Sequence, residues 1–213
     1  MPNLINQFAT SDVIMRIPAL LIAIVLHELA HGYVALLLGD HTAKSHGRLT
    51  LNPIKHVDPL GLLALWLVGI GWAKPVPVNP MYFQGDRRRG MFLVGLAGPV
   101  TNFILALLTA LLIVILPFQP GSTMLGIMQL TLFYNIVLGV FNLIPIPPLD
   151  GSKVLAYFLP RQAAVQLSQL ERYGPLVLIL LIFTGSLWRI LTPLINGAFT
   201  VIITIVSLLT GGF

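Results

Sequence analysis

The sequence predicts an all-α polytopic membrane protein with about five transmembrane helices and a membrane-associated β-hairpin or re-entrant region over residues 39–90. Two observations carry this prediction. Of the 213 residues, 56% are hydrophobic and only 9% are charged, whereas charged residues make up about 25% of an average soluble domain. Long apolar runs also recur at the length of a bilayer crossing, about 20 residues of helix. We therefore expect a single integral-membrane domain, residues 1–213, within a lipid bilayer.

The apolar runs give the predicted helices in chain order. They cover residues 17–38, 91–116, 124–145, 175–189 and 191–210. The run 175–189 is short for a full crossing. Together with the run that follows, it predicts a C-terminal helical hairpin over about 175–210.

Residues 39–90 follow a different pattern. The stretch "GRLTLNPIKHVDPLG" begins with alternating polar and apolar residues and is then broken by Pro53 and Pro59, which indicates short strands and turns. In "KPVPVNP" prolines separate the valines. Because proline cannot donate a hydrogen bond to a sheet, this segment is predicted to be extended or an edge strand.

The apolar segment 60–73 lies between these stretches and is too short to span, so we expect it to be re-entrant or interfacial. Ten of the twelve lysines and arginines then fall on one side of the membrane, with Arg16 and Arg189 on the other. If the segment crossed, the split would be eight against four. The stronger bias places residues 39–90 in the cytoplasm, the N-terminus outside and the C-terminus inside. The net charge of +5 therefore needs no nucleic-acid partner.

The stretch "LHELAHG" places three ionisable residues inside the first apolar run. His27 and His31 are four residues apart, so on a helix they share one face, with Glu28 beside them. This H-E-x-x-H spacing is the zinc-protease motif, in which two histidines bind the metal and the glutamate acts as general base. A packed histidine pair with a hydrogen-bonded glutamate is the alternative. The chain has no cysteine, so nitrogen and oxygen atoms would hold any bound metal.

A catalytic zinc usually has three protein ligands, and Asp150 is the favoured third. It follows "FNLIPIPPL", where prolines must end the preceding apolar helix. With 60–73 re-entrant, helices 17–38 and 124–145 run in the same direction, so Asp150 approaches the level of His31. Capping of the next helix is the other reading of Asp150. The remaining candidates are Glu171, His41, His46, His56, Asp40, Asp58 and Asp86, most of which lie in polar loops.

Three separated motifs resemble the site-2 protease family of intramembrane zinc metalloproteases. They are "HELAH", "AGPVTN" at 97–102 and "NLIPIPPLDG" at 142–151, in the family's order. The segments "LTLNPIKHVDPLG" and "GWAKPVPVNP" also resemble its compact prokaryotic members, which lack PDZ and CBS modules. The resemblance covers more than half of the chain.

The resemblance implies a role for each matched residue. His27, His31 and Asp150 would bind one catalytic Zn²⁺, with Glu28 as general base. Asn142 would help to bind the substrate backbone or the oxyanion.

Two further expectations concern substrate binding. Asn102, in the Gly-Pro-x-x-Asn pattern, is a further candidate for substrate binding, although an interhelical hydrogen bond is the alternative for both asparagines. Val76 and Val78 lie in the extended segment that could pair with an unwound substrate.

The sequence therefore predicts a zinc metalloendopeptidase that cleaves peptide bonds in or near transmembrane segments of membrane proteins. Its catalytic core would be about 17–151, in a multi-pass protein of a prokaryotic cell membrane with an active site open to the cytoplasm. A zinc hydrolase with another third ligand, such as Glu171, is one alternative. A non-enzymatic transporter or metal-binding scaffold is the other, although a transporter is expected to show repeated halves, and none is visible here.

Overall fold

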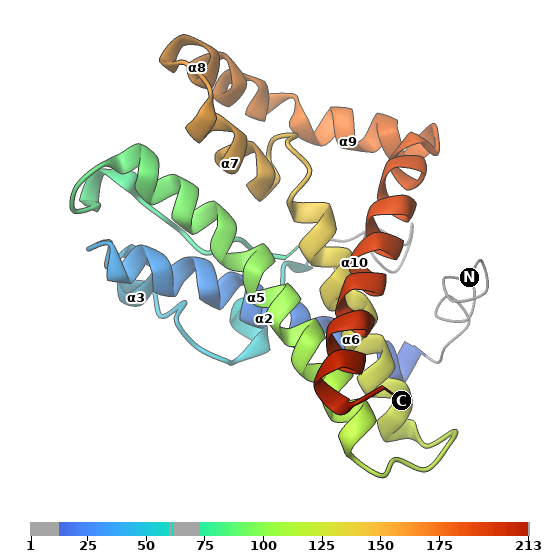
Figure 1. Cartoon of the computed structure of the whole chain (residues 1–213). Coiled ribbons are helices and arrows are strands. Elements are labelled where there is room, and N and C mark those ends of the chain that lie inside the picture. Colours follow the sequence, from blue (N-terminus) through green and yellow to red (C-terminus); the bar gives the residue numbers. More distant parts are fainter. Residues whose placement is uncertain (1–12, 60, 62–72, 213) are drawn as a thin grey trace.

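The computed structural model describes residues 13–59, 61 and 73–212, and in this part the chain is helical (Figure 1). Four helices are long and apolar enough to cross a membrane: α2 (Val13–Leu37), α5 (Arg87–Ile115), α6 (Thr123–Asn142) and α10 (Ser186–Thr210). Local sequence signals set their ends. Asp86 caps α5 by accepting hydrogen bonds from two backbone N–H groups of its first turn, and Ser122 caps α6 in the same way with one.

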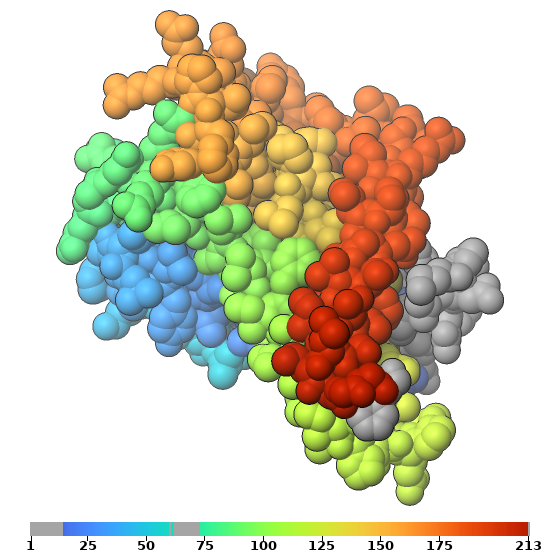
Figure 2. All heavy atoms as spheres, in the orientation of Figure 1, coloured from blue at the N-terminus to red at the C-terminus, as the bar shows by residue number. Residues whose placement is uncertain are grey.

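The potential spans pack around α5. Helix α5 contacts both α2 and α6, which also contact each other, and α10 lies along α5 and α6 on the outside (Figures 1 and 2). Small residues favour the close approach, because Ala106 and Ala110 of α5 lie in one buried apolar cluster with Ile136 of α6 and Leu191 of α10. Large apolar side chains such as Leu112 point outward and stay exposed, as lipid contact requires.

Short elements connect α6 to α10. They are α7 (Asp150–Phe158), α8 (Arg161–Gln169), the 3₁₀ turn η3 (Leu170–Arg172) and α9 (Gly174–Phe183). Helix α7 packs on α5, which brings its first residue back toward the middle of the bundle.

The predicted fourth span is replaced by a shorter element. Helix α9 has only 10 residues, about 15 Å of helix, and Figure 1 shows it lying across the end of α10. The break comes at Gly185, whose φ of +69° ends the helix before residue 189. Among the described residues the count of potential spans is therefore four, where five were expected.

The direction of α10 corrects one further expectation. Figure 1 shows α10 running back from the α9 end to the end that holds the loop between α5 and α6. The described C-terminal residues therefore lie at that loop's end of the molecule, and not on the side of residues 146–174, where the C-terminus was expected. The cause is the short α9, which leaves one fewer crossing.

The expected β-hairpin does not form in the described part of residues 39–90. That part contains α3 (Thr42–Ser45), the 3₁₀ turns η1 (Pro53–Lys55) and η2 (Pro80–Tyr82), and one isolated antiparallel bridge between Val57 and Ala73. The predicted re-entrant segment 60–73 lies almost wholly outside the described residues. Its two flanks are joined by that bridge, so they lie side by side.

Candidate metal centre

Helix α2 presents the two histidines of the motif on one face. His27 and His31 are one turn apart, with ring centroids 4.6 Å from each other, and each residue is only 6% exposed. Their Nε2 atoms are 3.0 Å apart. The motif spacing thus places two ring nitrogens at one point inside the bundle, as the sequence predicts.

Asp150, at the first position of α7, completes the group. Its Oδ2 atom lies 3.1 Å from Nε2 of His27 and 3.0 Å from Nε2 of His31. The loop after α6 folds back tightly to reach this point, and a Cβ on Gly151 would collide with the backbone carbonyls of Leu143 and Ile144. His27, His31 and Asp150 are close enough together to bind one metal ion, and no other such group of histidine and acidic residues is found among the described residues.

The other ring nitrogen of each histidine has its own partner. Nδ1 of His27 donates to Oδ1 of Asn102 over 2.6 Å, and Nδ1 of His31 donates to the carbonyl oxygen of Val94 over 2.6 Å. A carbonyl oxygen can only accept, so both Nδ1 atoms carry a proton, and in the neutral form of each ring Nε2 keeps the lone pair. This is the arrangement of outer partners that metal-binding histidines usually have.

These contacts make the group suitable for a metal cation. Two bare Nε2 atoms and a carboxylate oxygen face one another at 3.0–3.1 Å. With both protons held at Nδ1, no proton joins these three acceptors, so they repel one another unless a cation lies between them. Nitrogen and oxygen ligands of Zn²⁺ lie about 2.0–2.2 Å from the ion, and a triangle of this size fits such distances.

Gly98 gives the group its space. A Cβ at this position on α5 would lie 2.5 Å from both Cε1 of His27 and Nε2 of His31. The glycine in the "AGPV" stretch is therefore needed for the close approach of α5 to the histidines. The motif alone does not predict this function of Gly98, because it depends on how α5 packs on α2.

Glu28, the remaining residue of the motif, is held by a contact with the segment 75–79. Its Oε2 atom accepts a hydrogen bond of 2.8 Å from the backbone N–H of Val76, and the residue is half-buried. The extended segment 75–79 therefore contacts α2 directly. Val76 is buried and Val78 is half-buried.

A second carboxylate anchors the other end of this segment. Asp40 is fully buried, and its oxygens accept hydrogen bonds from the backbone N–H of Asn79, 2.6 Å away, and from the N–H and hydroxyl of Thr42. Burial alone would raise the pKa of Asp40, but these hydrogen bonds and the nearby His41 lower it below its ordinary value. Asp40 thus anchors the chain and lies outside the metal group.

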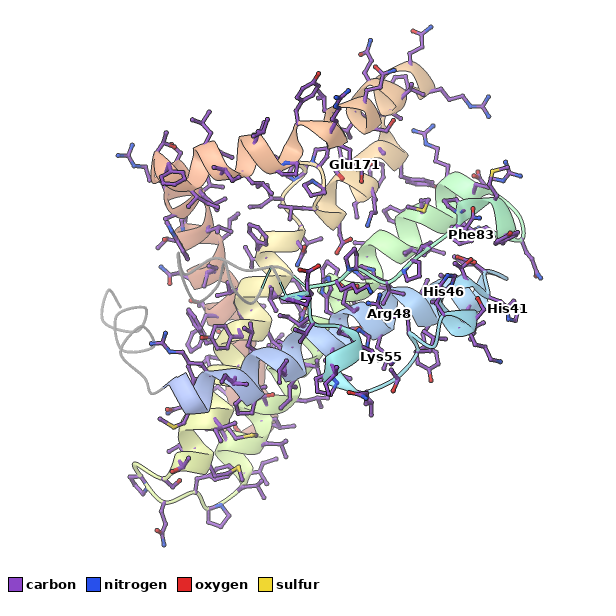
Figure 3. All side chains as sticks on the ribbon, turned by 180° about the vertical axis from the view of Figure 1, so that it is seen from behind. His41, His46, Arg48, Lys55, Phe83 and Glu171 are labelled. Carbon is purple, nitrogen blue, oxygen red and sulfur yellow. The ribbon has the colours of Figure 1, made fainter. Side chains whose placement is uncertain are left out.

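Other residues considered as ligands also lie elsewhere. Figure 3 shows His41 and His46 together at one end of the molecule, far from Glu171. The two histidines line a surface cavity of about 420 Å³. Glu171 in η3 lines another, of about 230 Å³.

The two asparagines predicted from the motifs have different surroundings. Asn142, at the end of α6, is half-buried, and its Nδ2 atom donates to the carbonyl oxygen of Leu138 over 3.1 Å. Asn102 is fully buried and contacts His27.

Two polar neighbours were missed by sequence analysis. Asn135 of α6 lies behind Asn102, and Lys153 of α7 has its Nζ atom 2.9 Å from Oδ1 of Asp150. A polar residue inside a predicted span is a usable signal, and Asn135 carries it.

Comparison with known proteins identifies the class. The model of peptidase family M50 matches residues 15–124 and 119–184. The chain therefore belongs to peptidase family M50, the site-2 protease family, and is a metalloprotease. No PDZ or CBS module was found. With four apolar helices in the described part of the chain, it is an integral membrane protein.

Individual relatives agree with this family. The chain is 42% identical over 186 residues to "Putative zinc metalloprotease YwhC" of Bacillus subtilis, with 84% of each protein covered. It is 34% identical over 198 residues to "Putative zinc metalloprotease Rip2" of Mycobacterium tuberculosis, covering 87% of this chain and 70% of the relative. It is also similar to "Zinc metalloprotease MJ0392" of Methanocaldococcus jannaschii, 29% identical over 143 residues, or 67% of this chain and 34% of that protein. No solved structure gives a significant match. The names of these relatives and the three facing acceptors agree on zinc as the cofactor.

Proposed function

We propose that this metalloprotease hydrolyses peptide bonds in or near transmembrane segments of other membrane proteins, as in regulated intramembrane proteolysis. One observation carries the proposal: the buried group of His27, His31 and Asp150 lies among helices that are apolar enough to span a bilayer. Ionisable groups in such a place are costly and are usually functional.

The three side chains would hold a single zinc ion through two nitrogens and one oxygen. Three protein ligands leave a position open, which is typical of catalytic zinc sites. When bound, zinc supplies Lewis-acid chemistry, drawing electron density from a scissile carbonyl and making water more acidic.

Glu28 is proposed as the general base. Its carboxylate is near enough to His27 to interact with it electrostatically, and from there it would take a proton from the attacking water and pass it to the leaving amine. The N–H of Val76 holds one carboxylate oxygen. This contact orients the base without occupying both oxygens.

The substrate would lie beside the segment 75–79. Val76 and Val78 are proposed to contact an unwound substrate strand, since segment 75–79 is extended and next to Glu28. Pro75 and Pro77 have no N–H group, so these residues offer a substrate no donor, and the carbonyl oxygen of Pro75 already accepts a hydrogen bond from Arg48. Asn142 is proposed to bind the substrate backbone or the oxyanion, and its half-buried position as the last residue of α6 leaves it accessible.

We further propose the organisation and placement of the chain. Residues 1–213 form one domain, with the catalytic core at about 17–151 and the remaining helices at about 175–210. The active site opens to the cytoplasm of a prokaryotic cell. Most lysines and arginines lie in residues 39–90 and 146–174, and a positive bias of this kind is typical of the cytoplasmic side.

The test is a comparison of zinc content and cleavage in purified protein. Wild type and Glu28→Ala are prepared in detergent, their zinc is measured, and each is incubated with a panel of single-span membrane proteins. We expect one zinc per chain in both and cleavage by wild type alone. Robust turnover by Glu28→Ala would refute the assignment of the base.

Two further variants separate the alternatives. Asp150→Ala is expected to lose zinc, whereas Glu171→Ala is expected to keep it, and the reverse result would assign the third ligand to Glu171. Zinc bound by a wild type that cleaves no membrane substrate would favour a metal-binding scaffold.

A further inference from the structure

A chain of buried amides leads from the metal group to α6. Nδ2 of Asn102 donates to Oδ1 of Asn135 over 2.8 Å, and Nδ2 of Asn135 donates to the carbonyl oxygen of Thr131 over 2.8 Å. Both asparagines are fully buried. Together with His27, they link the three helices α2, α5 and α6.

The chain has only one consistent direction. The carbonyl of Thr131 can only accept, so the amide nitrogen of Asn135 must face it and the amide oxygen must face Asn102. That oxygen, with the carbonyl oxygen of Ala23 at 3.1 Å, then fixes the amide nitrogen of Asn102. A flipped Asn102 would place its oxygen against two other oxygens.

The fixed amide in turn fixes the imidazole. The oxygen of Asn102 must face Nδ1 of His27, so the proton of the neutral ring is held at Nδ1 and the lone pair at Nε2. Nε2 is the atom that faces His31 and Asp150. The backbone carbonyl of Val94 does the same for His31 in a single step.

We propose that Asn135, acting through Asn102, is a positioning residue that sets the lone pair of His27 toward the metal. This inference rests on the proposed use of His27 as a zinc ligand. It also assigns Asn102 to the metal centre, because its oxygen and nitrogen are both engaged inside the protein. A direct role of Asn102 in substrate binding is not needed.

The cost of the arrangement supports a specific function. Two amides within an apolar bundle must have partners, since an unpaired buried polar group lowers stability. An apolar residue at 135 would bring no polar group that needs a partner. Holding one proton on one ring nitrogen is what the pair of asparagines adds.

The test uses the metal-free protein and a matched pair of variants. Asn135→Leu removes the amide, whereas Thr131→Val changes a buried polar side chain one turn away and leaves the carbonyl that Asn135 contacts. Each protein is labelled with ¹⁵N-histidine, stripped of metal with a chelator and measured by NMR in detergent at about pH 8.5, above the ordinary histidine pKa of about 6.5. His27 is assigned by its substitution.

The expected results separate positioning from packing. Wild type and Thr131→Val should show His27 with the proton at Nδ1 alone, and Asn135→Leu should show a mixture with the Nε2–H form. Zinc affinity, measured by competition with a chelating dye, should fall about 10-fold in Asn135→Leu and remain unchanged in Thr131→Val. Asn135→Ala serves if the leucine variant does not fold, with the same expectation.

The outcomes also distinguish this inference from the proposed protease activity. An unchanged His27 signal and unchanged zinc affinity in Asn135→Leu would overturn the positioning role, even if wild type cleaves membrane substrates. A shifted proton with weaker zinc binding would support it, even if wild type cleaves none of the substrates tested.

Discussion

Gly98 decides how closely α5 can approach the two histidines. A methyl group at this position would contact both imidazole rings, and helix backbone cannot move away without disturbing the packing of α5 on α2. Zinc ligands need their atoms placed within a few tenths of an ångström, so a small added volume is enough to disturb the centre.

The first prediction is that Gly98→Ala weakens zinc binding at least 10-fold while the helices remain folded. Alanine favours helix over glycine by about 1 kcal/mol, so a loss of zinc would come from the clash. Gly197→Ala on α10 is the control, because its Cβ would meet nothing within 4 Å. Zinc titration and circular dichroism measure the two effects. Equal zinc affinity in both variants would contradict the assigned function of Gly98.

Lys153 acts on the carboxylate that faces the histidines. Its Nζ atom donates a hydrogen bond to Oδ1 of Asp150. The other carboxylate oxygen, Oδ2, faces the two histidines. The lysine side chain is one-third exposed, so the interaction is partly screened by solvent.

The second prediction is that Lys153→Met lowers zinc affinity by about 3–10-fold, corresponding to about 1 kcal/mol for a partly exposed pair. Methionine keeps most of the side-chain volume but cannot donate to Oδ1. Lys44→Met removes an exposed lysine elsewhere and should leave the affinity unchanged. Chelator competition at two salt concentrations measures both, and an identical loss in the two variants would point to a general charge effect.

At the scale of elements, α2 and the segment 75–79 are joined by backbone N–H groups and carboxylates. Glu28 accepts a hydrogen bond from the N–H of Val76, and Asp40 accepts one from the N–H of Asn79. Both N–H groups are thus satisfied by side-chain carboxylates, and within the described residues the segment 75–79 forms no strand. Asp40 therefore holds the position of the segment next to the proposed base.

The third prediction concerns acid stability through Asp40. Its pKa is lowered in the folded protein, so its contribution to the free energy of unfolding is complete above the ordinary aspartate pKa of about 3.9 and is lost as the pH falls through the lower folded value. Asp40→Asn keeps the shape but turns an N–H group toward Asn79, and should lower stability by about 1–3 kcal/mol at pH 6.

The two proteins should become more alike as the pH is lowered below about 3.9. Thermal unfolding in detergent between pH 6 and pH 3 measures the difference. Asp86→Asn is the matched control because it caps α5 at the surface. A deficit in Asp40→Asn that stays constant over this pH range would contradict the ionised anchor.

The sequence predicted the elements whose signals are local. The helices containing His27, Gly98 and Asn142 were predicted from apolar length, and the end of α6 from its prolines. The break at Gly185 was missed because apolar residues continue on both sides of it, so composition alone gives no boundary. In the site, the H-E-x-x-H spacing and Asp150 could be predicted. Asn135 could not be assigned a partner, because its contact with Asn102 depends on how α5 and α6 cross.

For the whole molecule, the short α9 changes the predicted topology and strengthens the charge asymmetry. Arg189 lies in the first turn of α10, at the α9 end of the helix, and so belongs with the residues between α6 and α10. Arg16 is then the one basic residue assigned to the opposite side. A bias this strong favours a cytoplasmic location for α3, α7 and α8, and we then expect the C-terminus outside.

The fourth prediction tests this topology through single cysteines, which the natural absence of cysteine makes unambiguous. Gln119→Cys lies in the loop between α5 and α6, Gly212→Cys at the C-terminus, and Lys44→Cys in α3. On intact cells a membrane-impermeant maleimide should label positions 119 and 212 and leave position 44 unlabelled. Inverted vesicles should give the opposite pattern. Because position 212 shares a side with 119 when α9 does not cross, and with 44 when it does, its labelling separates four crossings from five.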